Sequence, residues 1–301
     1  MTDRREFLSH AAHIALLGAA PAAAAVTAGP PPLPGRRIPG TEQQLSVVGL
    51  GNSQAFRSGD EGLSARLVDL FLEHGGGYVD TSGDARLTVG ELLRARRAGD
   101  RLFLGSYLDG DSGDALRAEL AMLADVQGGG ALDLALSNDP DRYTGLAGEF
   151  AAMKHDGLVR YIGVARSGRA FFPAVRKLIE AGSVDVVQVN YSILEPEAAD
   201  EILPLAQDAG VAVVINRPFI NGRYFEIVRG RELPAWAAEF DCTSWAQFSL
   251  KYILANPAVT CVLTETTNPQ HLADNLAAGY GRLPDDDMRQ AMRGVMREMT
   301  G

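Results

Sequence analysis

The 301-residue sequence is poor in cysteine and histidine, with two of the first and five of the second. His10 and His13 belong to the N-terminal segment, and the other three histidines lie in helix-like stretches, which is typical of solvated or helix-terminal side chains. We therefore expect no metal site. Cys261 lies in an apolar strand-like run and Cys242 near a helix start, so we expect two buried free thiols rather than a disulfide.

The sequence also lacks an excess of positive charge. It carries 28 lysines and arginines against 38 aspartates and glutamates, which gives a formal net charge of -10. Such a surface repels the phosphates of nucleic acids, so nucleic acid is not an expected partner. The hydrophobic content of 46% is enough for a packed core and excludes disorder. The partner that we expect is a small-molecule ligand or substrate.

The N-terminal apolar stretch, residues 11–28, is too short and too broken by glycine and proline to span a membrane, which takes about 20 apolar residues. It follows the pair Arg4-Arg5, an order typical of a twin-arginine export signal. We interpret residues 1–28 as this signal and residues 29–35 as a proline-rich leader. The interpretation predicts a protein exported in folded form to the periplasm or another extracytoplasmic compartment, without stable membrane insertion after the signal is removed.

From residue 36 to residue 301, short apolar runs alternate with helix-length amphipathic segments. Eight runs predict strands: Leu45–Leu50, Gly77–Thr81, Leu102–Tyr107, Leu132–Leu136, Arg160–Val164, Val184–Asn190, Ala212–Asn216 and Thr260–Thr264. This alternation predicts a single α/β domain, a (β/α)8 TIM barrel. An open doubly wound sheet is the alternative, but Gly49-Leu50-Gly51 lacks the third glycine of a phosphate fingerprint.

The helical patterns lie between the strands and at the C-terminus. They cover Ser64–His74, Asp114–Asp125, Gly145–His155, Ala170–Ala181, Pro196–Ala209, Ser244–Ala255 and a terminal helix over Pro284–Met299. Residues 220–240 have no clear periodicity, so we expect them to cover the mouth of the barrel. In such a barrel the chemistry lies at the C-terminal ends of the strands.

Several motifs occur in a characteristic order. They are Gly49-Leu50-Gly51, Tyr78-Val79-Asp80-Thr81, Leu132-Asp133-Leu134, the run from Gly157 to Val164, Val187-Gln188-Val189-Asn190-Tyr191-Ser192, Asn216-Arg217-Pro218-Phe219 and Thr267-Asn268-Pro269. With these motifs the chain resembles the aldo/keto reductase family over nearly everything after residue 36. It looks most similar to the exported or bacterial branch that bears the stretch Thr243 to Gln247.

The resemblance implies a barrel that reduces carbonyls with NADPH through an aspartate, a tyrosine, a lysine and a histidine. The family aspartate corresponds to Asp80, but the tyrosine falls on Ala85, the lysine on Tyr107 and the histidine on Asn138. Ala85 has no proton to give, Tyr107 is not a permanent cation, and Asn138 does not titrate. We take Asp80, Tyr107 and Asn138 as the candidate catalytic residues, and expect all three to surround one pocket with Ala85.

The cofactor positions implied by the resemblance are only partly kept. Gln188 and Asn275 match cofactor-contacting positions, Asn216 stands where many members stack an aromatic ring, and Arg217 could meet an anion. Glu265 stands where the family has a small or basic residue, and its carboxylate would repel cofactor phosphates. We take Gln188, Asn216, Arg217 and Asn275 as candidate cofactor-binding residues.

Three functions follow as hypotheses. The leading one is an exported barrel that has lost NADPH-dependent carbonyl reduction, has no cofactor, and serves as a ligand-binding protein or catalyses a cofactor-free reaction with Asp80 as base and Tyr107 as acid. The alternative is a residual oxidoreductase of a small carbonyl or alcohol that keeps NADP(H). The third is a non-catalytic interaction protein. Tyr107 could also simply fill the space of the lysine, and Gln188 could be a barrel-lining residue kept for packing.

Overall fold

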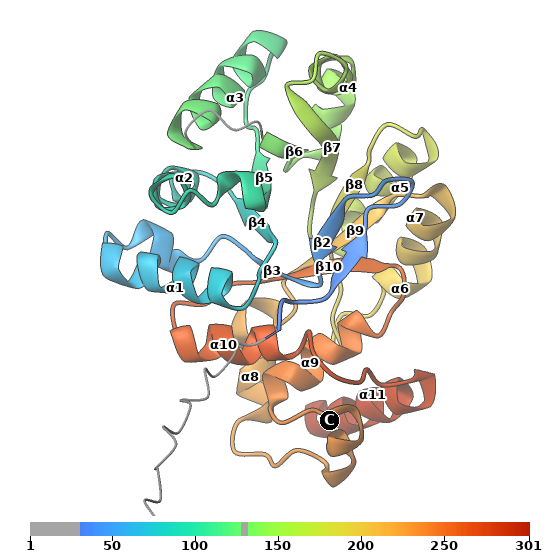
Figure 1. Ribbon diagram of the computed structural model, residues 1–301. Helices are drawn as coiled ribbons and strands as arrows, with labels where there is room; N and C mark the ends of the chain where they lie inside the picture. Colours follow the sequence, from blue (N-terminus) through green and yellow to red (C-terminus); the bar gives the residue numbers. More distant parts are fainter. Residues whose placement is uncertain (1–30, 128–131) are drawn as a thin grey trace, which may run out of the picture.

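The computed structural model describes residues 31–127 and 132–301 (Figure 1). The predicted export signal over residues 1–28 and the first two residues of the leader lie outside the described residues. Among the residues described, no helix has both the length and the apolar character needed to cross a membrane.

Eight parallel strands close into a barrel in the order β10-β3-β4-β5-β6-β7-β8-β9, with helices around it (Figure 1). The strands are β3 (Val48–Leu50), β4 (Tyr78–Thr81), β5 (Phe103–Tyr107), β6 (Leu132–Ser137), β7 (Val159–Ala165), β8 (Val186–Asn190), β9 (Ala212–Asn216) and β10 (Val259–Thr264). They are short and mostly buried on both faces, as in other parallel sheets covered by helices. The predicted (β/α)8 barrel is confirmed, and the open sheet is wrong.

The α-helices are α1 (Glu61–Glu73), α2 (Ala85–Ala95), α3 (Gly113–Gln127), α4 (Pro140–His155), α5 (Phe172–Glu180), α6 (Ala198–Glu201), α7 (Leu203–Ala209), α8 (Arg223–Val228), α9 (Trp245–Leu254), α10 (Pro269–Ala277) and α11 (Asp286–Thr300). Capping side chains determine the residue at which several of these helices begin. Asp139 accepts hydrogen bonds from the backbone nitrogens of Asp141 and Arg142, so α4 begins at Pro140, earlier than the predicted Gly145. The predicted helix Pro196–Ala209 is two helices that meet at Ile202.

The predicted strand Leu45–Leu50 is wrong as one element. Its first half, β2 (Gln44–Ser46), pairs antiparallel with β1 (Gly35–Arg37), and only Val48–Leu50 joins the barrel. Hydrophobicity runs through both halves because Leu45 packs into the barrel interior together with Ile38 of the same hairpin. The hairpin thus belongs to the interior core and crosses one end of the barrel (Figure 1).

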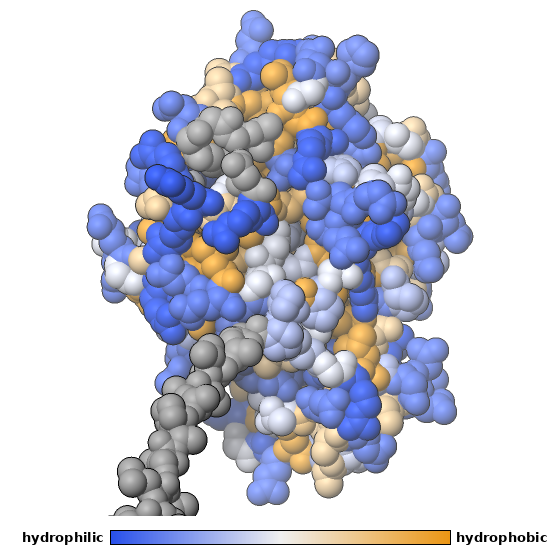
Figure 2. All heavy atoms as spheres, in the orientation of Figure 1, coloured by the Kyte–Doolittle hydropathy of each residue, from blue (hydrophilic) through white to orange (hydrophobic). Residues whose placement is uncertain are grey.

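Two apolar clusters form the core. The larger lies between the strands and the surrounding helices, and the smaller fills the barrel interior. Cys261 belongs to the interior cluster and Cys242 to the outer one, and both are buried free thiols as predicted. Hydrophilic residues cover most of the face seen in Figure 2, in keeping with the acidic composition.

Arg36 fastens the hairpin to the barrel. Its guanidinium donates hydrogen bonds to three carbonyl oxygens, of Leu254 at 2.5 Å, Asn256 at 3.2 Å and Val259 at 2.5 Å. These carbonyls follow α9 and open β10, so one side chain joins the hairpin, a helix end and a barrel strand. Burial lowers the pKa of Arg36 from its ordinary value.

We expect Arg36→Met to lower the free energy of unfolding by about 2 to 4 kcal/mol, because three carbonyl groups lose a charged donor. The neighbouring Arg37 is the matched control, since it is exposed and pairs with Glu42 at 2.9 Å. Arg37→Met should cost less than about 0.5 kcal/mol. Urea unfolding followed by circular dichroism measures both, and equal losses in the two variants would contradict the role given to Arg36.

Candidate active site

A cavity of about 360 Å³ opens at the C-terminal ends of the strands. Nine of its 14 lining residues have polar side chains, and two phenylalanines form part of the wall. The lining residues are Asn52, Asp80, Tyr107, Ser167, Gln188, Asn216, Arg217, Pro218, Phe219, Asn221, Gly222, Phe225, Leu263 and Glu265. Of the residues predicted for the site, the structure brings together Asp80, Tyr107, Gln188, Asn216 and Arg217.

Gln188 connects the polar groups at the floor of this cavity. Its Oε1 accepts hydrogen bonds from the hydroxyl of Tyr107 and from Nδ2 of Asn216, the latter at 3.4 Å. Its Nε2 donates to Oδ2 of Asp80 at 3.2 Å. The amide is therefore held in one orientation by groups on three other strands, β4, β5 and β9.

Asp80 is 2% exposed, and its Oδ2 accepts two hydrogen bonds from within the protein. Besides the amide of Gln188, the hydroxyl of Tyr78 donates to its Oδ2 at 2.7 Å. Gly105 makes room for this pair, because a Cβ atom there would lie 2.9 Å from the Tyr78 hydroxyl oxygen and 3.1 Å from Oδ2 of Asp80. A side chain at position 105 would push the two groups apart.

Burial gives Asp80 and Tyr107 unusual acidities. The pKa of Asp80 is raised to about 7, chiefly by desolvation and to a smaller extent by the charge of Glu265, whereas the hydrogen bonds from Tyr78 and Gln188 act in the opposite direction. Desolvation, followed by the charges of Asp80 and Glu265, raises the pKa of Tyr107 well above its ordinary value. Tyr107 therefore stays protonated near neutral pH, while Asp80 changes charge there.

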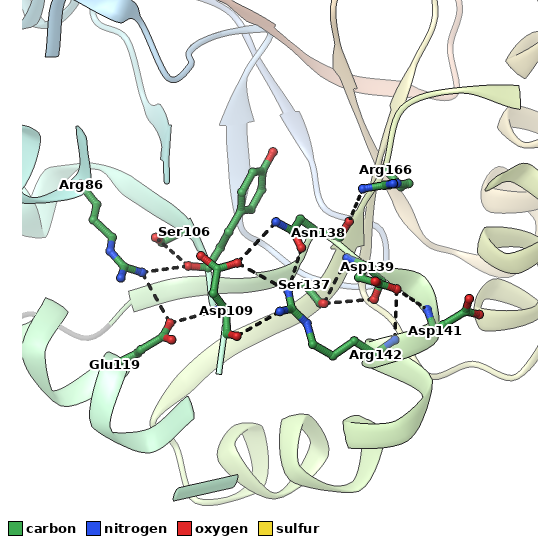
Figure 3. Close-up of polar contacts among 11 residues, drawn as sticks. Arg86, Ser106, Asp109, Glu119, Ser137, Asn138, Asp139, Asp141, Arg142 and Arg166 are labelled. Atoms are coloured by element: carbon green, nitrogen blue, oxygen red, sulfur yellow. Dashed lines mark hydrogen bonds and ion pairs between the residues drawn. The ribbon is translucent and has the colours of Figure 1, made fainter. Parts of the chain in front are cut away.

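Asn138 and Ala85 do not line the cavity, so the expectation that both surround it is wrong. Ala85 is the first residue of α2 and is fully buried in the outer core. Asn138 belongs to a polar cluster on the rim (Figure 3). Its Oδ1 accepts from Nη2 of Arg142 at 2.7 Å, and its Nδ2 donates to Oδ1 of Asp109 at 3.4 Å. The rim cluster thus occupies both ends of the Asn138 amide.

The rim cluster continues toward Tyr107 (Figure 3). Nη1 of Arg86 donates to the backbone oxygen of Tyr107 at 3.1 Å and lies 3.5 Å from Oε2 of Glu119. The same Glu119 oxygen accepts from the backbone nitrogen of Asp109 at 3.0 Å. The end of β5 is therefore fixed from outside the cavity, by residues for which the sequence offered no periodic signal.

A second cavity of about 440 Å³ adjoins the first. The two share Phe219, Phe225 and Glu265 in their linings, so they lie side by side, and we refer to this pair of cavities as the groove. The lining of the second cavity is completed by Ser244, Trp245, Ala246, Thr266, His271, Asp274 and Asn275. The predicted residue Asn275 thus lies in the outer part of the groove, apart from the other predicted site residues.

Glu265 lies at the junction of the two cavities. One of its carboxylate oxygens accepts from the backbone nitrogen of Asn52 at 3.2 Å. Gly51 allows this approach, because a Cβ atom there would lie 2.9 Å from Cγ of Glu265. Although solvent reaches the side chain, the surrounding protein desolvates its carboxylate enough to raise its pKa.

The loop after β9 forms the wall that both cavities share. Arg217, Ile220 and Asn221 have φ angles of 50°, 50° and 53°, a left-handed backbone that is costly for a β-branched residue such as isoleucine. Within the described residues, the buried Nε of Arg217 has no hydrogen-bond partner. Arg217 also lines the inner cavity, so the loop places a cationic side chain there.

The aldo/keto reductase family model matches residues 47–293. The chain belongs to the aldo/keto reductase family. Among curated proteins it is 24% identical over 221 residues to the NADH-specific methylglyoxal reductase of Escherichia coli (strain K12), covering 63% of this chain and 65% of that protein, less than two thirds of the relative's length. It is 23% identical over 303 residues to the uncharacterized oxidoreductase YqkF of Bacillus subtilis (strain 168), with 84% and 94% covered.

Solved structures of aldo/keto reductases share the fold. The holo form of the aldo-keto reductase AKR11C1 from Bacillus halodurans superposes with a TM-score of 0.73 at 20% identity, covering 87% of this chain and 96% of that one. An aldo/keto reductase from Klebsiella pneumoniae in complex with NADP and acetate gives a TM-score of 0.68 at 18% identity, covering 86% and 94%. Within residues 31–127 and 132–301 of this aldo/keto reductase, no group of histidine, cysteine, aspartate and glutamate side chains is arranged to hold a metal ion.

The pKa of Asp80 predicts a pH-dependent stability. Between the ordinary value of 3.8 and about 7, the folded protein retains a proton that the unfolded chain has released, so stability falls as the pH rises through this window. Asp80→Asn abolishes this dependence. The difference in the free energy of unfolding between the variant and wild type should shift in favour of the variant by up to about 4 kcal/mol from pH 4 to pH 8. This follows from about 1.36 kcal/mol per unit of pKa shift.

Urea unfolding at pH 4, 6 and 8 measures the effect, with Asp111→Asn as control because Asp111 is exposed. The control should follow the wild type at each pH. A constant offset between Asp80→Asn and wild type across the range would show that folding does not raise the pKa of Asp80.

Proposed function

We propose that the chain is a nicotinamide-dependent oxidoreductase that acts on a small carbonyl compound or alcohol in the groove. The single observation that carries the proposal is the adjacency of the two cavities, with Gln188 oriented in the inner cavity and Asn275 in the lining of the outer one. A long groove of this kind suits an extended dinucleotide better than a compact ligand. The oxidoreductases among the relatives support the same class of reaction.

The residues of the groove fit such a cofactor, with one opposing group. The amide of Gln188 is preoriented, and Asn275 is 3% exposed at the outer end. The guanidinium of Arg217, which lines the inner cavity, offers a counter-charge for phosphate. The carboxylate of Glu265 opposes phosphate at the junction. Gln188, Asn216, Arg217 and Asn275 would hold the dinucleotide, which when bound supplies hydride to a carbonyl or accepts it from an alcohol.

Tyr107 is the proton donor in this proposal. Ala85 has no exchangeable proton, and both ends of the Asn138 amide are engaged at the rim. Tyr107 lines the inner cavity, and its hydroxyl stays protonated because of its raised pKa. The hydroxyl is held by its hydrogen bond to Gln188 Oε1, which a substrate oxygen would replace as the acceptor. The same raised pKa makes it a weak acid, so we expect slow turnover.

A cofactor-free role is the second candidate, favoured by Glu265 at the junction and by the pKa of about 7 of Asp80. Asp80 as base and Tyr107 as acid would then move a proton on a bound ligand. An absorbance spectrum and mass measurement of the purified, denatured protein separate the candidates. Released NAD(H) or NADP(H) supports the oxidoreductase. Protein free of nucleotide that also fails to bind added NADH or NADPH supports the second candidate.

The export signal over residues 1–28 remains part of the proposal. Transport in folded form to an extracytoplasmic compartment would allow a tightly bound cofactor to travel with the protein. The arginine pair and the apolar stretch that follows it support this localisation. Fractionation of cells that produce the full chain, compared with an Arg4→Lys, Arg5→Lys variant, tests it.

We expect Tyr107→Phe to lower kcat/KM for NADH-dependent reduction of methylglyoxal by about 10²–10⁴, because the phenyl ring keeps the packing and loses the proton. Methylglyoxal is the first substrate to try because an Escherichia coli relative is named for its reduction. Tyr161→Phe is the control, since Tyr161 belongs to the barrel interior and its hydroxyl bonds Thr41 in the hairpin at 3.4 Å. If Tyr107→Phe keeps wild-type kcat/KM, Tyr107 is not the donor.

A further inference from the structure

The outer cavity of the groove carries negative charge and no cation in its lining. Its two charged lining residues are Glu265 and Asp274, and neither lysine nor arginine contributes to it. Asp274 is already engaged, because its two oxygens accept from Ser244 Oγ and Gln247 Nε2, both at 2.7 Å. Glu265 is bonded to protein through the backbone nitrogen of Asn52 and faces both cavities.

The cations around the groove lie elsewhere. Arg217 lines the inner cavity and does not contribute to the outer one. Arg57 acts on the charge of Glu265 from a distance, but it is exposed and lines neither cavity. His271 lines the outer cavity as well. Within the described residues, a dianionic phosphate in the outer cavity would therefore meet carboxylates without a lining guanidinium or ammonium.

We propose that the groove binds NADH in preference to NADPH, and that Glu265 causes the discrimination. The inference rests on the proposed function, and it specifies which nicotinamide dinucleotide the chain takes. The two dinucleotides differ only in a 2′-phosphate, which carries about two negative charges at neutral pH. A carboxylate can accept a hydrogen bond from a ribose hydroxyl, as acidic residues do in other NAD sites, whereas it repels a phosphate at the same position.

The preference should be large enough to measure directly. We expect NADH to bind the wild-type protein about tenfold or more tightly than NADPH at low salt, a difference of about 1.4 kcal/mol. Glu265→Gln keeps the size of the side chain and removes its charge. The variant should have similar dissociation constants for NADH and NADPH, mainly because its affinity for NADPH increases.

The experiment is a titration of the purified full chain with NADH and NADPH at pH 8, followed by quenching of protein fluorescence and by calorimetry. AMP and its 2′-phosphorylated counterpart are titrated in parallel, because they also differ by a 2′-phosphate but lack the nicotinamide half. Arg57→Gln is the matched control. It removes a charge that acts on Glu265 without changing either lining, so it should leave NADH the tighter ligand.

The outcomes separate this inference from the proposed function. If wild-type protein binds NADH more tightly than NADPH, and the difference between the two dissociation constants is smaller in Glu265→Gln, both the inference and the proposed function are supported. NADPH that binds as tightly as NADH overturns the inference and leaves the oxidoreductase standing. If the ratio of the two dissociation constants is unchanged in Glu265→Gln, the inference is also overturned, because the discrimination would then come from another group. If neither dinucleotide nor either adenosine fragment binds, the inference and the proposed function both fail.

Discussion

The carboxylate of Asp80, buried at the axis of the barrel, is the constraint on which the polar centre depends. A buried carboxyl group needs donors from the protein, because water is largely excluded. Tyr78 and Gln188 are those donors, and Gly105 is the residue that leaves space for them. Once Gln188 is oriented toward Asp80, its oxygen faces Tyr107, so the position of the Tyr107 hydroxyl follows from the needs of Asp80.

The barrel could be predicted because its strands are buried on both faces and read as apolar runs. The same signal failed at Leu45–Leu50, since a hairpin that packs into the barrel interior is as apolar as a strand of the barrel. The start of α4 was missed for a different reason. Its position is set by the Asp139 cap, a single side-chain contact that hydrophobic periodicity does not record.

The candidate site could be predicted where a side chain stands at a strand end, as Asp80, Tyr107 and Gln188 do. Strand position could not show that Asn138 turns to the rim, because that depends on Arg142 and Asp109, which lie on separate segments. Other lining residues, Asn52, Ser167, Phe219 and Phe225, come from loops. Loop conformation depends on backbone geometry such as the positive φ angles after β9. The sequence therefore placed Phe225 only within a segment expected at the barrel mouth and Phe219 only within a family motif, and it did not point to Asn52 or Ser167.

Tyr107 influences the electrostatics of the whole centre. The family resemblance places a lysine there, and an ammonium beside a carboxylate lowers the pKa of the carboxylate. Tyr107 offers a neutral hydroxyl, which is directed to Gln188 instead of Asp80. Desolvation then dominates and the pKa of Asp80 rises to about 7. A centre that a lysine would keep permanently charged becomes one that exchanges a proton near neutral pH, and Tyr107 remains beside it as a protonated hydroxyl that faces the cavity.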